Sequence, residues 1–295
     1  MTAADVAEGR TIPRLDSRGL DFSNLTSISD EEIQAFRQSY LTEDGNRQSG
    51  FDFLIDNNPA ALKTYRYFVT SIQAPFRDPR YQAAIFGGIA QYGLMDFEEG
   101  IRYSISPALR AGFTRQQIGE GLSLSFMVGG TRTLVTVARA LQNYDWPGTA
   151  EDALPWPDGW TADPAAFSSG VDFSVIDVLA GEVEKIVGWY EQTISWVPGW
   201  VRYFARHNPA ALKGWRYRYE NALVTLPKQV LPLSFLFAGA ALEYRELTRE
   251  NFLLARAWGV PLEQVLQTIE IAAVYGTEKI SSAYAAIGDL IDEVP

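Results

Sequence analysis

The chain has 295 residues, of which 47% are hydrophobic and 21% charged, so it can bury a sizeable core and is not globally disordered. Acidic residues outnumber basic ones by 36 to 25, and the resulting net charge of −11 argues against nucleic acid as a partner. The sequence has no cysteine and a single histidine, His207, which excludes disulfides, thiolate nucleophiles and multi-histidine metal sites. We therefore expect a protein without a metal ion or another cofactor.

Two segments bear on the localisation of the protein. The longest apolar run, 230–242, is shorter than the roughly 20 residues that a membrane-spanning helix needs. Residues 1–14 are polar and lack the apolar stretch of a signal peptide. We therefore expect a cytoplasmic protein that does not bind a membrane.

The first elements in chain order are helices with recognisable start signals. Residues 1–50 are predicted to be an N-terminal extension, in which the sequence at 29–32 has the spacing of a helix-capping box and precedes an amphipathic helix over 31–40. Pro59 and, further along the chain, Pro209 stand where a helix can begin, because the first turn of a helix tolerates proline.

The later elements are longer helices, some of them interrupted by glycine. Helical periodicity covers three stretches: 81–94, 116–141 and 262–290. The second stretch begins with a capping-box spacing at 114–117 and is broken at Gly129 and Gly130, and the third begins at Pro261 with an expected interruption at Gly276. Strand-like alternation is nearly absent, so the predicted fold class is all-α.

A loop-like segment, 145–169, lies between these helices. It is rich in proline, glycine and aspartate, which favour turns. It also contains Trp146, Trp156 and Trp160, and these large aromatic side chains predict that the segment packs on the surface of the protein.

The chain contains an internal repeat. The ten residues from Asn58 to Tyr67 reappear from Asn208 to Tyr217 with eight identities, and two weaker matches follow at an offset of 147 residues. We therefore predict two copies of one helical unit. The predicted units are the extension 1–50, repeat 1 at 51–145, a Pro/Trp-rich linker with a connecting helix at 146–199, and repeat 2 at 200–295.

Two lysines, Lys63 and Lys213, occupy the same place in the repeated motif. A lysine that is shielded from water could form a Schiff base with a substrate. A repeated surface lysine is the more common case, and it is our expectation for both positions.

The segment 98–118, EEGIRYSISPALRAGFTRQQI, resembles the signature of the carboxymuconolactone decarboxylase and AhpD-like superfamily. The Asn-Pro-Ala-Ala-Leu opening of each copy is similar to the first helix of that family, and Tyr275-Gly276 is similar to a later turn. The resemblance covers about two-thirds of the chain and implies a tandem pair of AhpD-like units around a pseudo-twofold axis. It also implies that the protein forms a homodimer or homotrimer.

The reactive groups of that family are not present at the matching positions. Alignment places Ser104 and Asn251 where the family has its signature histidine, and no cysteine stands where the peroxidase branch has a CxxC pair. Without a thiol, disulfide-based reduction of peroxides is excluded.

Glu99, Arg102 and His207 are the candidates for catalysis. The resemblance implies a reactive position on the helix that holds Glu99 and Arg102, where a carboxylate could move a proton and a guanidinium could bind an acidic substrate. The alternative is a helix on the surface, where these side chains form exposed salt bridges that contribute little to stability. His207 has an unperturbed pKa near neutrality and could be a general acid or base, and the alternative is a capping position.

Further side chains near the same helix or its counterpart could orient a substrate: Ser104, Tyr103, Tyr244, Asn251 and Tyr275. Hydroxyl and amide groups can hydrogen-bond a carbonyl group, and a tyrosine can also donate a proton. The alternative for each of them is a structural position in which the polar atom is satisfied by the protein. We predict no metal ligands among them.

These observations favour a cofactor-free lyase-type enzyme that acts on a small apolar organic acid, lactone or cyclic ketone by decarboxylation, elimination or isomerisation through proton transfer. One alternative is a non-catalytic ligand-binding or scaffold protein derived from the same fold. Another is a cyclase or tailoring enzyme of a biosynthetic pathway. Catalytic residues should converge in one buried place, whereas those of a scaffold should be dispersed.

Overall fold

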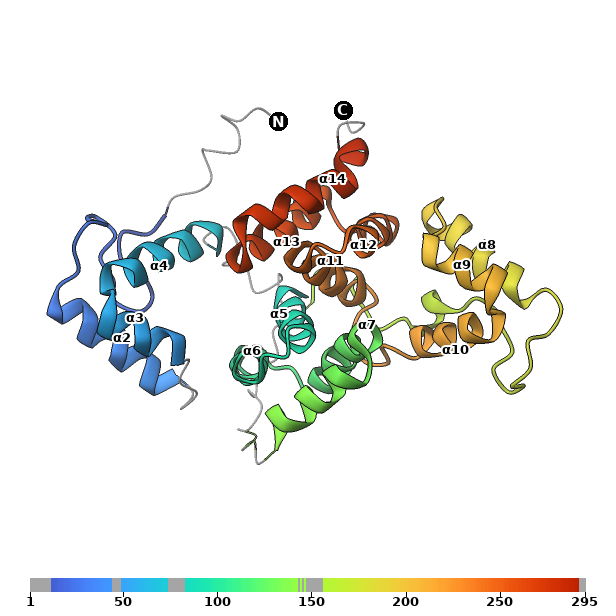
Figure 1. Cartoon of the computed structure of the whole chain (residues 1–295), viewed down its shortest axis with the longest axis horizontal. Coiled ribbons are helices and arrows are strands. Elements are labelled where there is room, and N and C mark those ends of the chain that lie inside the picture. Colours follow the sequence, from blue (N-terminus) through green and yellow to red (C-terminus); the bar gives the residue numbers. More distant parts are fainter. Residues whose placement is uncertain are drawn as a thin grey trace.

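A computed structural model describes residues 12–43, 49–73, 83–142, 144, 146 and 156–291 (Figure 1). These residues form helices joined by turns and contain no β-strand; the extended pairings among them are two isolated bridges, Leu15 with Asp21 and Ala162 with Pro227. The predicted all-α fold is therefore confirmed. None of the helices in these ranges is long and apolar enough to cross a membrane.

The helices fall into three groups along the longest axis of the molecule (Figure 1). The N-terminal lobe consists of α2 (Asp30–Glu43), α3 (Ser49–Asn57) and α4 (Pro59–Gln73). The central bundle consists of α5 (Ala83–Leu94), α6 (Glu98–Arg110), α7 (Arg115–Leu141), α11 (Val230–Leu242), α12 (Arg245–Ala257), α13 (Leu262–Ala272), the short turns η4 (Ala273–Tyr275) and η5 (Thr277–Lys279), and α14 (Ile280–Ile291). The second lobe consists of η3 (Pro164–Phe167), α8 (Glu182–Ile194), α9 (Gly199–His207) and α10 (Pro209–Glu220).

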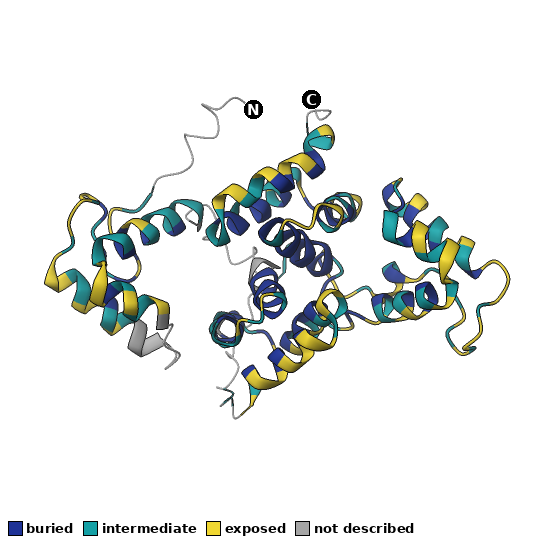
Figure 2. Cartoon of the chain, in the orientation of Figure 1, coloured by how far each residue is buried: buried dark blue, intermediate teal, exposed yellow. Residues whose placement is uncertain are grey.

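Helices α5 and α11 pack against each other in the middle of the central bundle, where Figure 2 shows them as buried. Every residue of α11 from Val230 to Ala241 is buried, because α5, α12 and α13 all pack against it. Two glycines allow the close contacts of α11: a Cβ atom added at Gly87 would lie 2.8 Å from the Cβ of Phe237, and one added at Gly239 would lie 3.0 Å from the backbone nitrogen of Thr248.

The Gly239→Ala variant is expected to lower the free energy of unfolding by about 1–3 kcal/mol, because the added methyl group meets the backbone of α12, which cannot rotate away. Gly214→Ala on α10 is the matched control. No atom lies within 4 Å of the Cβ added there, and alanine is the better helix former, so we expect a small stabilisation of up to about 1 kcal/mol. Urea denaturation of both variants checks the prediction, and equal effects would contradict it.

The predicted helix starts are confirmed. Capping boxes form at 29–32 and 114–117, where the first residue of each accepts a hydrogen bond from the backbone N–H three residues later, over 3.2 Å in both cases. Helices α4 and α10 begin at Pro59 and Pro209, and the asparagine before each proline caps the helix by accepting from a backbone N–H.

Both predicted interruptions are also present. Helix α7 runs past Gly130, whose φ of +67° lies outside the helical region. Gly276 has a φ of +150° and separates η4 from η5, so that the predicted stretch 262–290 is divided into α13 and α14. Glycine suits both positions because other residues rarely adopt such positive φ values.

Packing joins part of the predicted N-terminal extension to the first repeat. Leu20, Phe22 and Phe36 form one buried cluster with Ile55 and Leu62, so the segment before α2 and the helix itself pack on α3 and α4. This cluster is the core of the N-terminal lobe.

The loop-like segment packs on the protein as predicted, at least over its described residues. Trp160 is buried, Trp156 stacks against it with ring centres 6.2 Å apart, and Trp156 also contacts Phe113. Trp146 lies against Tyr144 and beneath the guanidinium group of Arg115. Residues 147–155 lie outside the described part of the chain.

The two repeated lysines are buried, which corrects the expectation of a surface position. Lys63 and Lys213 are 2% and 5% exposed. Each pairs with a glutamate of the helix two before its own, Glu32 of α2 at 2.7 Å and Glu182 of α8 at 2.8 Å, and each donates to a backbone carbonyl. The ammonium groups are buried because a helix and a loop that come earlier in the chain fold over them, and a local sequence motif does not reveal this.

A second buried ion pair lies in the N-terminal lobe. The Nε and NH2 atoms of Arg66 donate to the two carboxylate oxygens of Asp16 over 3.1 and 3.0 Å. Both residues are at most 9% exposed, and the Thr70 hydroxyl donates to the same carboxylate over 3.1 Å. This pair ties the loop before α2 to α4.

Candidate functional site

Arg102, one of the three predicted catalytic residues, lies on α6 and binds the C-terminal end of the neighbouring helix α7. Its Nε donates to the carbonyl oxygen of Ala140 over 2.7 Å and its NH2 to that of Arg139 over 3.3 Å. Arg249, which lies 147 residues later on α12, donates in the same way to the carbonyl of Ala286 over 2.9 Å. The Arg102 guanidinium group therefore satisfies carbonyl groups in the last turn of α7, where a helix leaves them without partners, and that of Arg249 binds a carbonyl group in the C-terminal half of α14.

The other two predicted catalytic residues are not brought together. Glu99 lies in the first turn of α6 and is half-buried. His207 is the last residue of α9, is exposed, and contacts Tyr203 with ring centres 4.8 Å apart. Helix α9 belongs to the second lobe and lies well away from α6 (Figure 1). The residue that caps α10 is Asn208, which directly follows His207.

Ser104 and Asn251, at the positions of the family's histidine, are both buried. The Asn251 side chain donates to the carbonyl of Leu247 in its own helix over 2.8 Å. Ser104 faces α5, where a Cβ atom at Gly88 would lie 3.5 Å from its hydroxyl oxygen. Tyr244, at the start of α12, is 50% exposed.

Tyr275 forms a pair with Tyr92 of α5, and Tyr103 lies near both phenols. The Tyr92 hydroxyl donates to that of Tyr275 over 2.9 Å, and the two rings meet edge to face. Burial raises the pKa of both phenols, and Tyr103 and Tyr65 lie close enough to raise it further. Tyr92 and Tyr275 stay protonated at physiological pH, so they can donate hydrogen bonds but do not serve as bases.

A second cluster contains a carboxyl group that is not among the predicted catalytic and substrate-binding residues. Glu250, on α12, is 4% exposed. Burial raises its pKa to about 7, and the hydrogen bond that the Trp200 indole donates over 3.2 Å offsets only part of this effect. Near neutral pH this carboxyl group is thus present in both its protonated and its ionised form.

Arg216 of α10 lies near Glu250 in this cluster, and its side chain is completely buried. Its guanidinium carbon lies 4.0 Å from the ring centre of Trp189, and its Nε donates to Glu220 over 2.9 Å. Its NH2 donates to the carbonyl of Phe167. The remaining nitrogen of Arg216, NH1, has no hydrogen-bond partner among the described residues.

The phenols beside Glu250 also have hydroxyl groups without hydrogen-bond partners among the described residues. The hydroxyl groups of Tyr190 and Tyr219 are buried without a hydrogen-bond partner in the described part of the chain, and burial raises the pKa of both well above the usual value. We call Glu250, Arg216, Tyr190, Tyr219 and Trp200 the Glu250 cluster. Its residues come from α8, α9, α10 and α12, so it forms where the second lobe meets the central bundle.

One signal in the sequence could have revealed Glu250. It stands three residues after Leu247 and four before Leu254, on the apolar face of an amphipathic helix. A carboxylate on such a face is rarely buried unless it is paired or functional.

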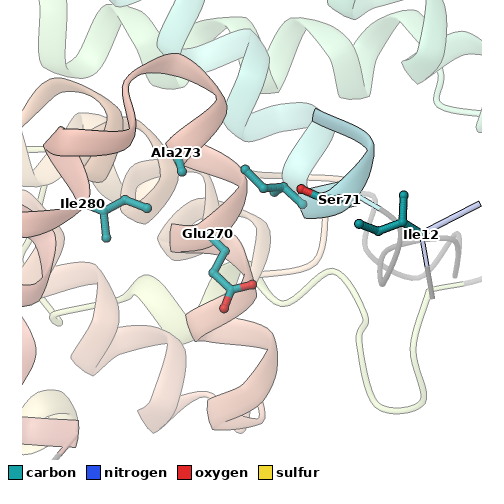
Figure 3. Close-up of a pocket in the computed structure, with 6 residues that line it drawn as sticks. Ile12, Ser71, Glu270, Ala273 and Ile280 are labelled. Atoms are coloured by element: carbon teal, nitrogen blue, oxygen red, sulfur yellow. The ribbon is translucent and has the colours of Figure 1, made fainter. Parts of the chain in front are cut away.

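An open groove of about 300 Å³ lies elsewhere, between α4 and the α13–α14 region (Figure 3). Its lining residues are Ile12, Ser71, Ile72, Glu270, Ala273 and Ile280. None of the predicted site residues lines it. In the part of the chain that the structure describes, no three His, Asp or Glu side chains gather as a metal site requires.

Neither a model of a known protein family nor a curated protein matches the sequence. Among solved structures, the chain is similar to a crystal structure provisionally described as a gamma-carboxymuconolactone decarboxylase subunit from Burkholderia xenovorans. The two chains are 15% identical with a TM-score of 0.55, and the match covers 89% of this chain and 98% of that chain. The resemblance predicted from segment 98–118 is confirmed at the level of the fold: this chain has the all-α fold of that carboxymuconolactone decarboxylase structure.

Proposed function

We propose that the chain is a cofactor-free lyase-type enzyme that acts on a small apolar organic acid, lactone or cyclic ketone, and that Glu250 is its proton-transfer residue. The observation that carries this proposal is the buried carboxyl group of Glu250 among polar side chains that lack partners. A carboxyl group with a pKa of about 7 can both give and accept a proton at neutral pH.

Decarboxylation illustrates the chemistry that such a site can support. The bond between the substrate carbon and its carboxylate breaks, carbon dioxide leaves, and the electron pair stays on the carbon. Protonated Glu250 then delivers a proton to that carbon and recovers one from water. In an isomerisation the same carboxylate would first accept a proton from one carbon and then return it to another.

The test uses gamma-carboxymuconolactone, which the description of the similar structure suggests, together with related lactone acids. Release of carbon dioxide and the change in ultraviolet absorbance report turnover. We expect Glu250→Gln to lower kcat about a hundredfold, because the amide cannot transfer the proton. Glu99→Gln, at the competing position on α6, should retain most of the activity. A loss confined to Glu99→Gln would assign proton transfer to α6 and refute the role of Glu250.

A second candidate function is that of a non-catalytic ligand-binding or scaffold protein. It is favoured by the dispersal of the predicted catalytic set, in which Arg102 binds the end of α7 while His207 and Tyr244 are exposed. Binding of lactone acids without turnover by the wild-type protein would support this function over the first.

We also propose that the chain arose as a tandem pair of units. Matched contacts support this proposal: the buried pairs of Lys63 and Lys213, and the helix-end contacts of Arg102 and Arg249, recur at offsets of 150 and 147 residues.

A further inference from the structure

We propose that Arg216, Tyr190 and Tyr219 form an oxyanion subsite, which binds the carboxylate or enolate oxygen of a flat unsaturated substrate. This inference rests on the proposed function, since it assigns the substrate class of the same site. It also moves the anion-binding role from Arg102, whose guanidinium group holds the end of α7, to a residue of the second lobe.

The first argument is the number of hydrogen-bond donors without partners in one place. Folded proteins satisfy the large majority of their buried polar groups, so each exception needs an explanation. Here three exceptions, Arg216 NH1 and the hydroxyl groups of Tyr190 and Tyr219, lie around one carboxyl group. Arginine has no acceptor atom, and the two phenols remain protonated. The group that would complete the cluster is therefore an acceptor.

The second argument is the charge of the cluster. The guanidinium group of Arg216 is already paired with Glu220, so the unused NH1 adds a directed donor and no further net charge. A charge-assisted hydrogen bond from NH1 and two from phenols suit a small anionic oxygen better than a metal ion or an ammonium group, which would need acceptors. When Glu250 is protonated, it adds a proton donor beside that oxygen.

The third argument is the shape of the surroundings. Trp200 and Trp215 lie with ring centres 4.2 Å apart, and Trp215 stacks on Tyr219 at 4.9 Å with an angle of 27° between the planes. Trp189 lies beneath the Arg216 guanidinium group. Aromatic faces on several sides favour a flat ligand with delocalised electrons over a branched aliphatic one.

Entry to the subsite requires the second lobe to move, because the cluster is buried where α8 packs against α12. The chain contains a more open version of this arrangement. In the N-terminal lobe, α2 and α3 precede their proline-started helix as α8 and α9 do, yet they stand away from α6 in Figure 1. Separation of such a lobe from its central helix is thus compatible with the fold.

The test measures binding, without turnover, of benzoate and of its neutral analogue benzamide by calorimetry and tryptophan fluorescence. We expect the wild-type protein to bind benzoate more tightly than benzamide. Tyr190→Phe and Tyr219→Phe should each weaken benzoate binding about tenfold, because each removes one hydrogen bond to a charged group. Tyr217→Phe, an exposed tyrosine on the same helix as Tyr219, is the control and should bind as the wild type does.

These variants also avoid the risk of misfolding that replacement of the buried Arg216 would carry. The two hydroxyl groups make no hydrogen bond in the unliganded protein, so the phenylalanine variants should melt at or above the wild-type temperature. Benzoate binding that is absent, or is unchanged in both variants, would overturn the subsite and leave ordered water as the partner of these groups.

The subsite and the proposed function can fail separately. If turnover depends on Glu250 but benzoate binding is unchanged when the two hydroxyl groups are removed, the subsite alone is refuted. Benzoate binding that depends on both hydroxyl groups, without turnover of any lactone acid, would refute the lyase function and retain the subsite.

Discussion

Replacement of Arg66 by methionine is expected to lower the free energy of unfolding of the N-terminal lobe by about 3–5 kcal/mol. The variant leaves Asp16, which is 3% exposed, without its cation and with the Thr70 hydroxyl as a side-chain donor. An uncompensated buried carboxylate is costly because water no longer solvates it. Thermal unfolding and hydrogen–deuterium exchange of the α4 amides measure the effect.

The matched control for this prediction is Arg37→Met. Arg37 pairs with Asp56 at 2.6 Å in the same lobe, but the two side chains are 39% and 62% exposed. We expect a loss below about 1 kcal/mol, as for other surface ion pairs. The double variant Arg66→Met with Asp16→Leu should recover much of the lost stability, because it removes the unpaired charge. Equal losses for Arg66→Met and Arg37→Met would refute the argument from burial.

Replacement of Glu250 by glutamine is expected to change the pH dependence of stability. The pKa of Glu250 is about 7 in the folded protein, against an ordinary value of 4.5. Between these two pH values the unfolded chain releases the proton first, so the wild type loses stability as the pH rises from about 4.5 to 7. This loss amounts to about 3 kcal/mol and is complete above pH 7. Glutamine does not titrate, so the variant should lack this loss.

Urea denaturation at pH 4.5, 6 and 8 checks this prediction. Relative to the wild type, Glu250→Gln should become progressively more stable over this range. Glu263→Gln, an exposed carboxylate on α13, serves as the control and should follow the wild-type profile. Parallel profiles for Glu250→Gln and the wild type would show that the pKa of Glu250 is the same in the folded and unfolded states.

Features that depend on neighbouring residues were predictable from the sequence. The capping boxes at 29–32 and 114–117, the starts at Pro59 and Pro209, and the break at Gly276 all arise from backbone geometry within one turn of the chain. The fold class followed from the same local periodicity. The resemblance of segment 98–118 was also sufficient to predict the fold of the similar structure.

Features that depend on distant residues were not predictable. Lys213 is buried because Glu182, 31 residues earlier, folds over it, and nothing in the repeated motif encodes that contact. Arg102 was interpreted as an anion-binding group, but the carbonyl groups that it binds lie 37 and 38 residues later. Glu250 acquires its surroundings from three helices of the second lobe. Tyr103 and Tyr275 were predicted to orient a substrate, whereas Tyr92, whose hydroxyl donates to that of Tyr275, has no motif to mark it.

The position of α11 has a consequence for biosynthesis. Its thirteen residues are almost entirely apolar, and such a segment is prone to aggregate while it lacks a folded partner. Its main contact, α5, lies more than a hundred residues earlier in the chain and leaves the ribosome first. The first half of the chain can therefore offer a ready surface as α11 emerges, and the order of translation shortens the time for which this segment is exposed to other nascent chains.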